Sequence, residues 1–197
     1  MTFSSSSPRQ GSSPSRRSAP SSYGCVSRFN HWLTATLFIG ALGLGLVMAY
    51  GGLPRESVGA LMGWHKALGV ATIAYGLWRV GWRIAKGFPP PASKTPAWQI
   101  AASKAVHVGL LAAILAMPLS GILMTVSSGR ALSIWGVTLL PSLGEIGWLE
   151  TAAEAVHAQL PFAVFAMLAL HIGAALKHHF IDHDATLARM TSGRIRA

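Results

Sequence analysis

Four long apolar segments follow one another along the chain, separated by polar or turn-forming stretches. They run over about 30–50, 58–84, 101–126 and 155–178. Each is close to the ~20 residues that an α-helix needs to cross the hydrocarbon core of a bilayer. Gly51, Gly52 and Pro54 end the first segment, the prolines at 89–91 end the second, and Pro118 predicts a kink inside the third. Because lipid admits only helices and closed barrels, the pattern predicts an all-α integral membrane protein, a bundle of four transmembrane helices.

The two ends of the chain have a different composition from this membrane domain, which we place at 25–190. Residues 1–24 contain ten serines, three prolines and three arginines. Such a segment buries too little apolar surface to offset its ordering entropy, so we expect a disordered, Ser-rich cytoplasmic tail. Arg16 and Arg17 resemble a twin-arginine export signal, but the first apolar stretch begins only near Leu33 and no small-residue cleavage site follows it. Residues 191–197 form a basic C-terminal tail.

The overall composition agrees with a membrane protein. Hydrophobic residues make up 51% of the chain and charged residues 11%, which is less than half of the roughly 25% typical of soluble domains. The formal net charge of +10 raises the question of nucleic acid binding. However, the basic residues form no stripe among base-stacking aromatics, and lie at the edges of the apolar segments instead. We therefore expect no nucleic acid partner and argue against a water-soluble enzyme.

The distribution of Lys and Arg predicts the orientation. Thirteen lie before the first segment, in or beside the connection between the second and third, or at the end of the fourth and beyond, against three in or beside the other two connections. By the positive-inside rule, both termini and the middle connection are expected on the cytoplasmic side of a bacterial inner membrane. The stretch from about Gly129 to Glu154, with Trp135 and Trp148, then lies outside or along the outer interface.

Five of the eight histidines fall within or at the rim of the apolar segments: His31, His65, His107, His157 and His171. An ionisable side chain inside a membrane is costly unless it finds a partner. A single histidine of this kind is often satisfied by a hydrogen bond between helices, whereas five favour a functional role.

The positions of these histidines predict two pairs at two depths. His157 and His171 are 14 residues apart, nearly four helical turns, so they share one helix face and lie roughly 21 Å apart along it. His65 is expected at the depth of His157 near the outer rim, and His31 at the depth of His171 near the inner rim. Paired neutral imidazoles between helices suit the two axial positions of a haem iron. Nearby small residues would leave room for the haem, although ordinary close packing of helices explains them equally well.

His107 complicates the inner pair, because it shares a depth with His31 and His171. Three histidines would compete for two axial positions, and depth alone does not choose between them. A His107 that is not a ligand would contact a haem propionate or a quinone, or simply a water molecule. Arg79 and Arg83, one helical turn apart, would pair with propionates or anchor the second segment at the interface.

The other candidate groups are weaker indications of a functional site. His178, His179 and His183 lie near Asp182 and Asp184 after the fourth segment, where a solvated helix end is favoured over a surface metal site. The single cysteine, Cys25, excludes an intramolecular disulfide and a cysteine-ligated iron–sulfur cluster. We expect it to be a free thiol.

Together these features resemble the bacterial cytochrome b561 family of di-haem, four-helix membrane proteins, over about Arg28 to Arg189. The matching stretches are Arg28-Phe29-Asn30-His31-Trp32, Met62-Gly63-Trp64-His65-Lys66-Ala67-Leu68-Gly69, the run from His107 through Met117-Pro118-Leu119-Ser120-Gly121, Val156-His157, and Leu170-His171 with His178-His179. Each fragment is weak alone, and their order and spacing carry the resemblance.

The resemblance implies that His31 and His171 hold the iron of an inner haem b, that His65 and His157 hold the iron of an outer one, and that His107 is not a ligand. It further implies an oxidoreductase that exchanges electrons with ubiquinone. Some family members oxidise superoxide at the outer face, and the resemblance makes this a candidate activity of the present chain. Lys66 and Arg130 on the outer side would then steer an anion such as superoxide.

Two alternatives to a self-contained oxidoreductase stay open. One is a cytochrome b subunit that passes electrons within a larger membrane dehydrogenase or hydrogenase complex. The other is a proton or metal transporter that uses the intramembrane histidines. The apolar segments contain no embedded carboxylate and no repeat of one half in the other, which argues against the transporter.

Overall fold

The computed structural model describes residues 23–88 and 95–192, and these contain four long helices and one short one. The long helices are α1 (Cys25–Tyr50), α2 (Arg55–Lys86), α3 (Ala97–Ser127) and α4 (Gly147–Phe180), and the short helix is α5 (Thr186–Met190). The predictions for residues 1–22, for the three prolines at 89–91 and for residues 193–197 lie outside the described residues.

Each predicted apolar segment lies inside one long helix, and every long helix extends beyond its segment. The largest difference is at α4, which begins at Gly147 rather than near residue 155. Hydropathy marks only the part of a helix that contacts lipid, whereas the backbone hydrogen bonds continue into the polar flank. Pro118 and Pro161 both lie within helices, α3 and α4 respectively.

Within the described ranges, three helices are long and apolar enough to cross a membrane: α1, α3 and α4. The helix that contains the second predicted segment, α2, falls outside this group. It carries Lys66, Arg79 and Arg83 along its length in addition to charged residues at both ends. The chain is thus a mostly helical protein with three candidate membrane spans within the described ranges, and a fourth span through α2 stays a prediction.

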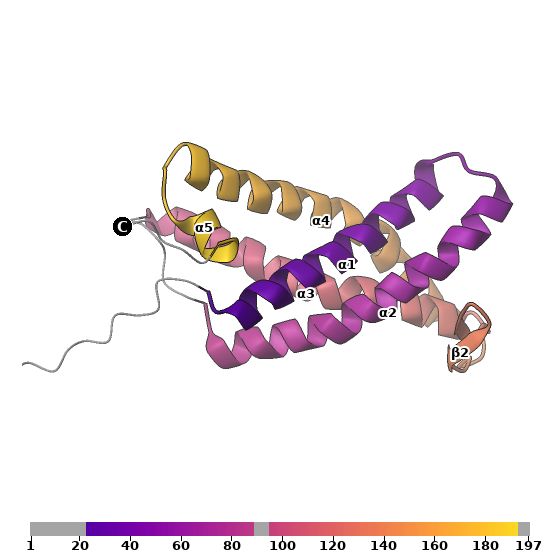
Figure 1. The fold of residues 1–197 in the computed structure, drawn as a ribbon. Helices are drawn as coiled ribbons and strands as arrows, with labels where there is room; N and C mark the ends of the chain where they lie inside the picture. Colours follow the sequence, from indigo (N-terminus) through magenta and orange to yellow (C-terminus); the bar gives the residue numbers. More distant parts are fainter. Residues whose placement is uncertain (1–22, 89–94, 193–197) are drawn as a thin grey trace, which may run out of the picture.

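The helices pack as two antiparallel pairs, α1 with α2 and α3 with α4, and the pairs meet mainly where α2 contacts α3 (Figure 1). The core between them is small and apolar, and comprises Phe38, Leu42, Ala113, Ile114, Met117 and Val164. Large hydrophobic side chains such as Leu77, Leu170 and Phe180 are exposed on the outside. An exposed apolar exterior around a small buried core is what a lipid environment requires.

A β-hairpin, which the sequence analysis did not predict, lies between α3 and α4. Strand β1 (Leu132–Ile134) pairs antiparallel with β2 (Val137–Leu140), and the register has an irregularity between Leu132 and Ser133. The hairpin and α5 lie at opposite ends of the bundle (Figure 1). They mark the two ends of the molecule, which we call the hairpin end and the α5 end.

The α5 end is tied to the start of α1 by side chains. The indole nitrogen of Trp32 donates to the carbonyl of Met190 at 3.0 Å, and Arg28 reaches the carbonyl of Thr191 at 3.4 Å. One carboxylate, that of Asp184, accepts from Nδ1 of His178 at 2.8 Å and from the backbone N–H of Thr186 at 2.8 Å. The C-terminal segment is thereby folded back against the bundle.

Candidate functional site

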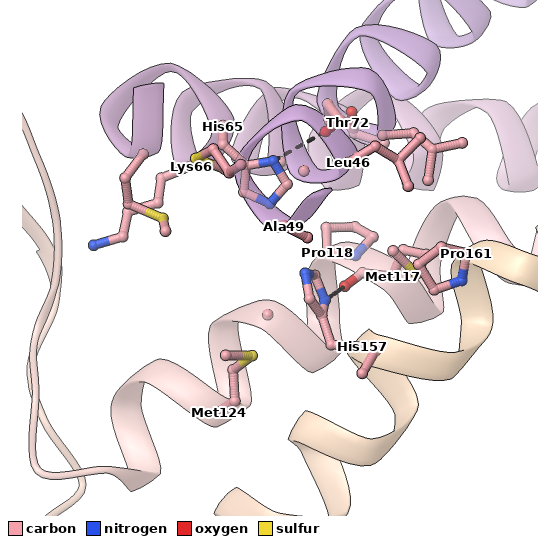
Figure 2. Close-up of a pocket in the computed structure, with 18 of the residues that line it drawn as sticks. Leu46, Ala49, His65, Lys66, Thr72, Met117, Pro118, Met124, His157 and Pro161 are labelled. Carbon is pink, nitrogen blue, oxygen red and sulfur yellow. Dashed lines mark hydrogen bonds between the residues drawn. The ribbon is translucent and has the colours of Figure 1, made fainter. Parts of the chain in front are cut away.

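A cavity of about 430 Å³ separates the α1/α2 pair from the α3/α4 pair in the half of the bundle nearest the hairpin. All four long helices line it, and apolar side chains form most of its wall, among them Phe38, Leu42 and Phe162. Its polar lining includes His65, Lys66 and His157, and Figure 2 shows these residues around it. An apolar chamber with a few convergent polar groups is the usual form of a cofactor site.

His65 of α2 and His157 of α4 face each other across this cavity. Their ring centres are 6.0 Å apart and their planes are 88° from parallel. The Nδ1 atom of His65 donates to the carbonyl of Ala41 at 2.9 Å, and Nδ1 of His157 donates to the carbonyl of Met117 at 3.0 Å (Figure 2). A carbonyl can only accept, so both neutral rings carry their hydrogen on Nδ1. The lone pair on Nε2 is left free in each ring, which is how a ligating histidine is held.

Two glycines allow these imidazoles to lie against neighbouring helices. A Cβ built on Gly121 of α3 would lie 2.9 Å from Cε1 of His157, and one on Gly45 of α1 would lie 3.2 Å from Cε1 of His65. Both distances are shorter than an ordinary contact. A larger residue at either position would push the ring away from its place.

Three histidines meet toward the opposite end of the bundle, nearer to α5. The ring centres of His31 and His171 are 6.2 Å apart, with the planes at 67°. His107 lies nearer to His171, at 5.2 Å between ring centres. The structure therefore brings together both predicted pairs, and it also brings His107 into the inner group, as its depth suggested.

All three ring-to-ring distances lie in the range of about 4.5–7 Å that is ordinary for rings in contact. The two predicted pairs have nearly equal spacings of 6.0 and 6.2 Å, whereas the His107–His171 spacing is shorter, at 5.2 Å. Which of these histidines hold a cofactor stays a prediction.

Arginines and aromatic rings surround the inner histidines. Nη2 of Arg79 donates to Nδ1 of His31 at 2.9 Å. The guanidinium of Arg83 lies 5.1 Å from the centre of the Phe88 ring, and the same ring stacks on His107 with centres 5.8 Å apart. Since a guanidinium only donates, Nδ1 of the neutral His31 ring is an acceptor and its hydrogen is on Nε2. His31 thus differs from His65 and His157, because axial ligation through Nε2 requires Arg79 to turn to another acceptor.

The remaining predicted groups are placed as follows. Lys66 lines the cavity and its Nζ donates to the carbonyl of Ser133 at 3.5 Å, whereas Arg130 is exposed and donates to Oγ of Ser128 at 2.8 Å. Cys25 is an exposed free thiol. His178 is hydrogen-bonded to Asp184, and the described ranges hold no group of three or more His, Cys, Asp or Glu side chains arranged around a metal.

Sequence reasoning missed several residues of the site. It expected small residues near each histidine to leave room, but the glycines that touch the imidazoles come from neighbouring helices, Gly45 for His65 and Gly121 for His157. It also missed Ser120, whose Oγ lies 3.1 Å from Nδ1 of His157. These contacts join different helices, so spacing along one helix does not reveal them.

Comparison with known proteins identifies the family of the chain. Residues 22–193 match the family described as prokaryotic cytochrome b561. The chain is 34% identical over 182 residues to cytochrome b561 homolog 2 of Escherichia coli (strain K12), which covers 87% of this chain and 92% of that protein. It is 35% identical over 106 residues to cytochrome b561 homolog 1 of the same strain, covering 54% of this chain and 58% of that protein.

A more distant relative carries a name that refers to an activity. The probable superoxide oxidase CybB of Yersinia pestis is 24% identical over 169 residues, which is 85% of this chain and 94% of that protein. The family match spans nearly the whole described chain, including all five histidines of the two groups. The chain belongs to the prokaryotic cytochrome b561 family of haem-containing membrane proteins that transfer electrons.

Proposed function

We propose that this protein holds two haems b within a four-span bundle and passes electrons between the outer face of a bacterial inner membrane and ubiquinone. The observation that carries the proposal is a pair of neighbouring imidazoles from different helices toward each end of the bundle, with ring centres 6.0 and 6.2 Å apart. When bound, each haem iron supplies one-electron redox chemistry. The chain supplies the ligands, an apolar enclosure and the charges that tune each potential.

At the hairpin end, His65 and His157 would hold the outer haem. Their Nδ1–H groups are already bound to backbone carbonyls, so the orientation of each ring is set by the helix next to it. The apolar cavity wall supports this role, because exclusion of water from the iron limits side reactions.

At the α5 end, His31 and His171 would hold the inner haem. Arg79 and Arg83 would pair with carboxylates of that haem, and this pairing would release Nδ1 of His31 from Arg79. His107, whose ring lies beside that of His171, is then available as a hydrogen-bonding group for ubiquinone or a propionate.

We assign superoxide as the electron donor, on two grounds. One relative of the chain is named a probable superoxide oxidase. In addition, Lys66 stands on the cavity wall at the hairpin end, where a cation attracts an anion. Two superoxide anions would each lose one electron to give two O₂, and ubiquinone would take up those two electrons with two protons to give ubiquinol.

The distribution of charge supports the orientation given above, with both termini in the cytoplasm. The α5 end would then face the cytoplasm and the hairpin end the outer side of the membrane. In this orientation superoxide would react at the hairpin end, and the protons of ubiquinol would come from the α5 end.

The test is a reduced-minus-oxidised spectrum with haem quantified per chain, on detergent-purified wild type, His157→Ala, His171→Ala and His179→Ala. His179 lies on the same helix and outside both pairs, so its variant is the control. We expect two haems in the wild type and the control, and one in each of the other variants, with a different haem lost in each. Superoxide-dependent reduction of ubiquinone in the wild type completes the test.

Two outcomes would overturn the proposal. A wild type without haem would reject both sites. Two haems with no superoxide-dependent quinone reduction would reject the donor, and stoichiometric co-purification of a dehydrogenase or hydrogenase would then assign the chain as a subunit of that complex.

A further inference from the structure

The turn of the β-hairpin has an unusual residue at its first position. Trp135 and Gly136 connect β1 to β2, and both have positive φ angles, 48° and 86°. A two-residue turn of this kind strongly favours Asn, Asp or Gly at its first position, because other side chains meet the backbone there. A tryptophan held in this conformation indicates that its side chain gains a contact that offsets the strain.

That contact is made with α2, at the residue pair that precedes His65. A Cβ built on Gly63 would lie 2.6 Å from Nε1 of Trp135, so the indole lies directly against the helix backbone. The ring of Trp135 also meets the ring of Trp64 edge to face, with centres 4.8 Å apart. The indole therefore needs a glycine at position 63.

A second link follows on the other side of His65. Nζ of Lys66 donates to the carbonyl of Ser133 in β1 at 3.5 Å. Gly63, Trp64 and Lys66 of α2 all contact the hairpin, and they flank His65 on both sides in the sequence. The hairpin holds the turn of α2 from which this histidine projects into the cavity.

The hairpin also forms part of the cavity wall. Leu132 of β1 is 3% exposed and lines the cavity, and Ile134 is 8% exposed. These two side chains point inward while every residue of β2 is exposed. Leu132 thus makes the hairpin part of the wall of the cavity that contains His65 and His157.

We propose that Trp135 is a positioning residue for the outer haem. Its indole holds the hairpin against Gly63 and Trp64 of α2, a contact that we call the clasp, and this contact fixes His65 and keeps water out of the cavity. The inference rests on the proposed function, since it concerns the haem that His65 and His157 would hold. Loss of the clasp admits water to the cavity, and water favours the oxidised form of the iron, which carries one more positive charge.

The test compares Trp135→Asn and Gly63→Ala with two matched controls. Asn suits the positive φ of the turn, so Trp135→Asn removes the indole without adding strain. Gly63→Ala leaves the indole present but places a methyl group where it lies. The controls are Gly59→Ala, one turn earlier in α2 with nothing within 4 Å of its Cβ, and Trp148→Ala, an exposed tryptophan in α4 outside the hairpin.

The readouts are the redox titration of each haem and the electron paramagnetic resonance spectrum of the oxidised haems. In both test variants we expect the ratio of reduced to oxidised outer haem, at fixed poise, to fall by about threefold or more. We also expect the resonance of that haem to shift, since it reports the orientation of the axial imidazoles. The inner haem and both controls should match the wild type, and inner-haem content shows that a variant is folded.

The outcomes separate the two proposals. A wild type without an outer haem contradicts the proposed function itself. A wild type with both haems, but with outer-haem titration and resonance unchanged in Trp135→Asn and in Gly63→Ala, overturns the clasp. Equal changes in Gly59→Ala and Gly63→Ala also overturn it, because the effect would then come from replacing a glycine in α2 and not from displacing the indole.

Discussion

Gly121→Ala adds a single methyl group at the glycine that lies closest to a histidine of the cavity. The Cβ would lie 2.9 Å from Cε1 of His157, and ordinary contact begins at 3.4 Å, so the ring has to retreat by about 0.5 Å. A metal site tolerates displacements of about 0.2 Å from its ideal distances. The backbone of α3 is itself expected to be more stable in this variant, because Ala replaces Gly in a helix with a gain of up to about 1 kcal/mol. Any loss at the site is then a steric effect on His157.

Disturbing the support of a metal ligand typically reduces affinity about 10- to 100-fold, which corresponds to about 1.4–2.8 kcal/mol of binding free energy. We expect a loss of this size for the outer haem of Gly121→Ala and none for the inner haem. The assay is the rate at which each haem transfers to an excess of apo-myoglobin, with haem per chain measured on the purified protein. Gly173→Ala in α4 is the control, because nothing lies within 4 Å of its Cβ. Wild-type retention of the outer haem in Gly121→Ala would refute the assignment of His157 as a closely packed ligand.

Three further predictions concern charged side chains. Arg79→Gln should lower inner-haem retention several-fold, because it removes the cation beside His31 that would pair with a haem carboxylate. The same transfer assay measures this retention, and unchanged retention would remove Arg79 from the site. Lys66→Gln combined with Arg130→Gln should slow superoxide-dependent quinone reduction severalfold at low ionic strength and flatten its salt dependence, and an unchanged rate and salt dependence would exclude steering. Asp184→Ala should release α5 and speed its cleavage by trypsin severalfold, while cleavage as slow as in the wild type would show that other contacts hold the helix.

Periodicity and depth were enough to predict the helical part of the fold and the grouping of histidines. The four apolar segments all lie within helices, and the 14-residue interval between His157 and His171 placed them at the levels where His65 and His31 are found. These features follow from properties of a single helix, its length and its rise per residue. The family resemblance noticed in the sequence is confirmed by the family match. The identity of the haem ligands stays a prediction.

The features that were not predicted depend on contacts between elements. The hairpin of 132–140 has strands of three and four residues, too short for an alternating pattern to be distinguished from a loop. The donation from Arg79 to His31 joins α2 to α1, and no sequence spacing encodes it. The length of α4 beyond its apolar segment was also missed, because hydropathy reports contact with lipid and not helical backbone.

Both predicted pairs take one member from α4, while the partners come from two different helices, α1 and α2. The separation between the two predicted haem positions is therefore set along one helix by a whole number of residues and not by the docking of mobile parts. An insertion of one residue between 157 and 171 would turn one histidine by about 100° away from its partner. Changes in the connecting loops leave this interval untouched. If both pairs hold haem as proposed, the register of this one helix fixes the distance between the two electron-carrying sites.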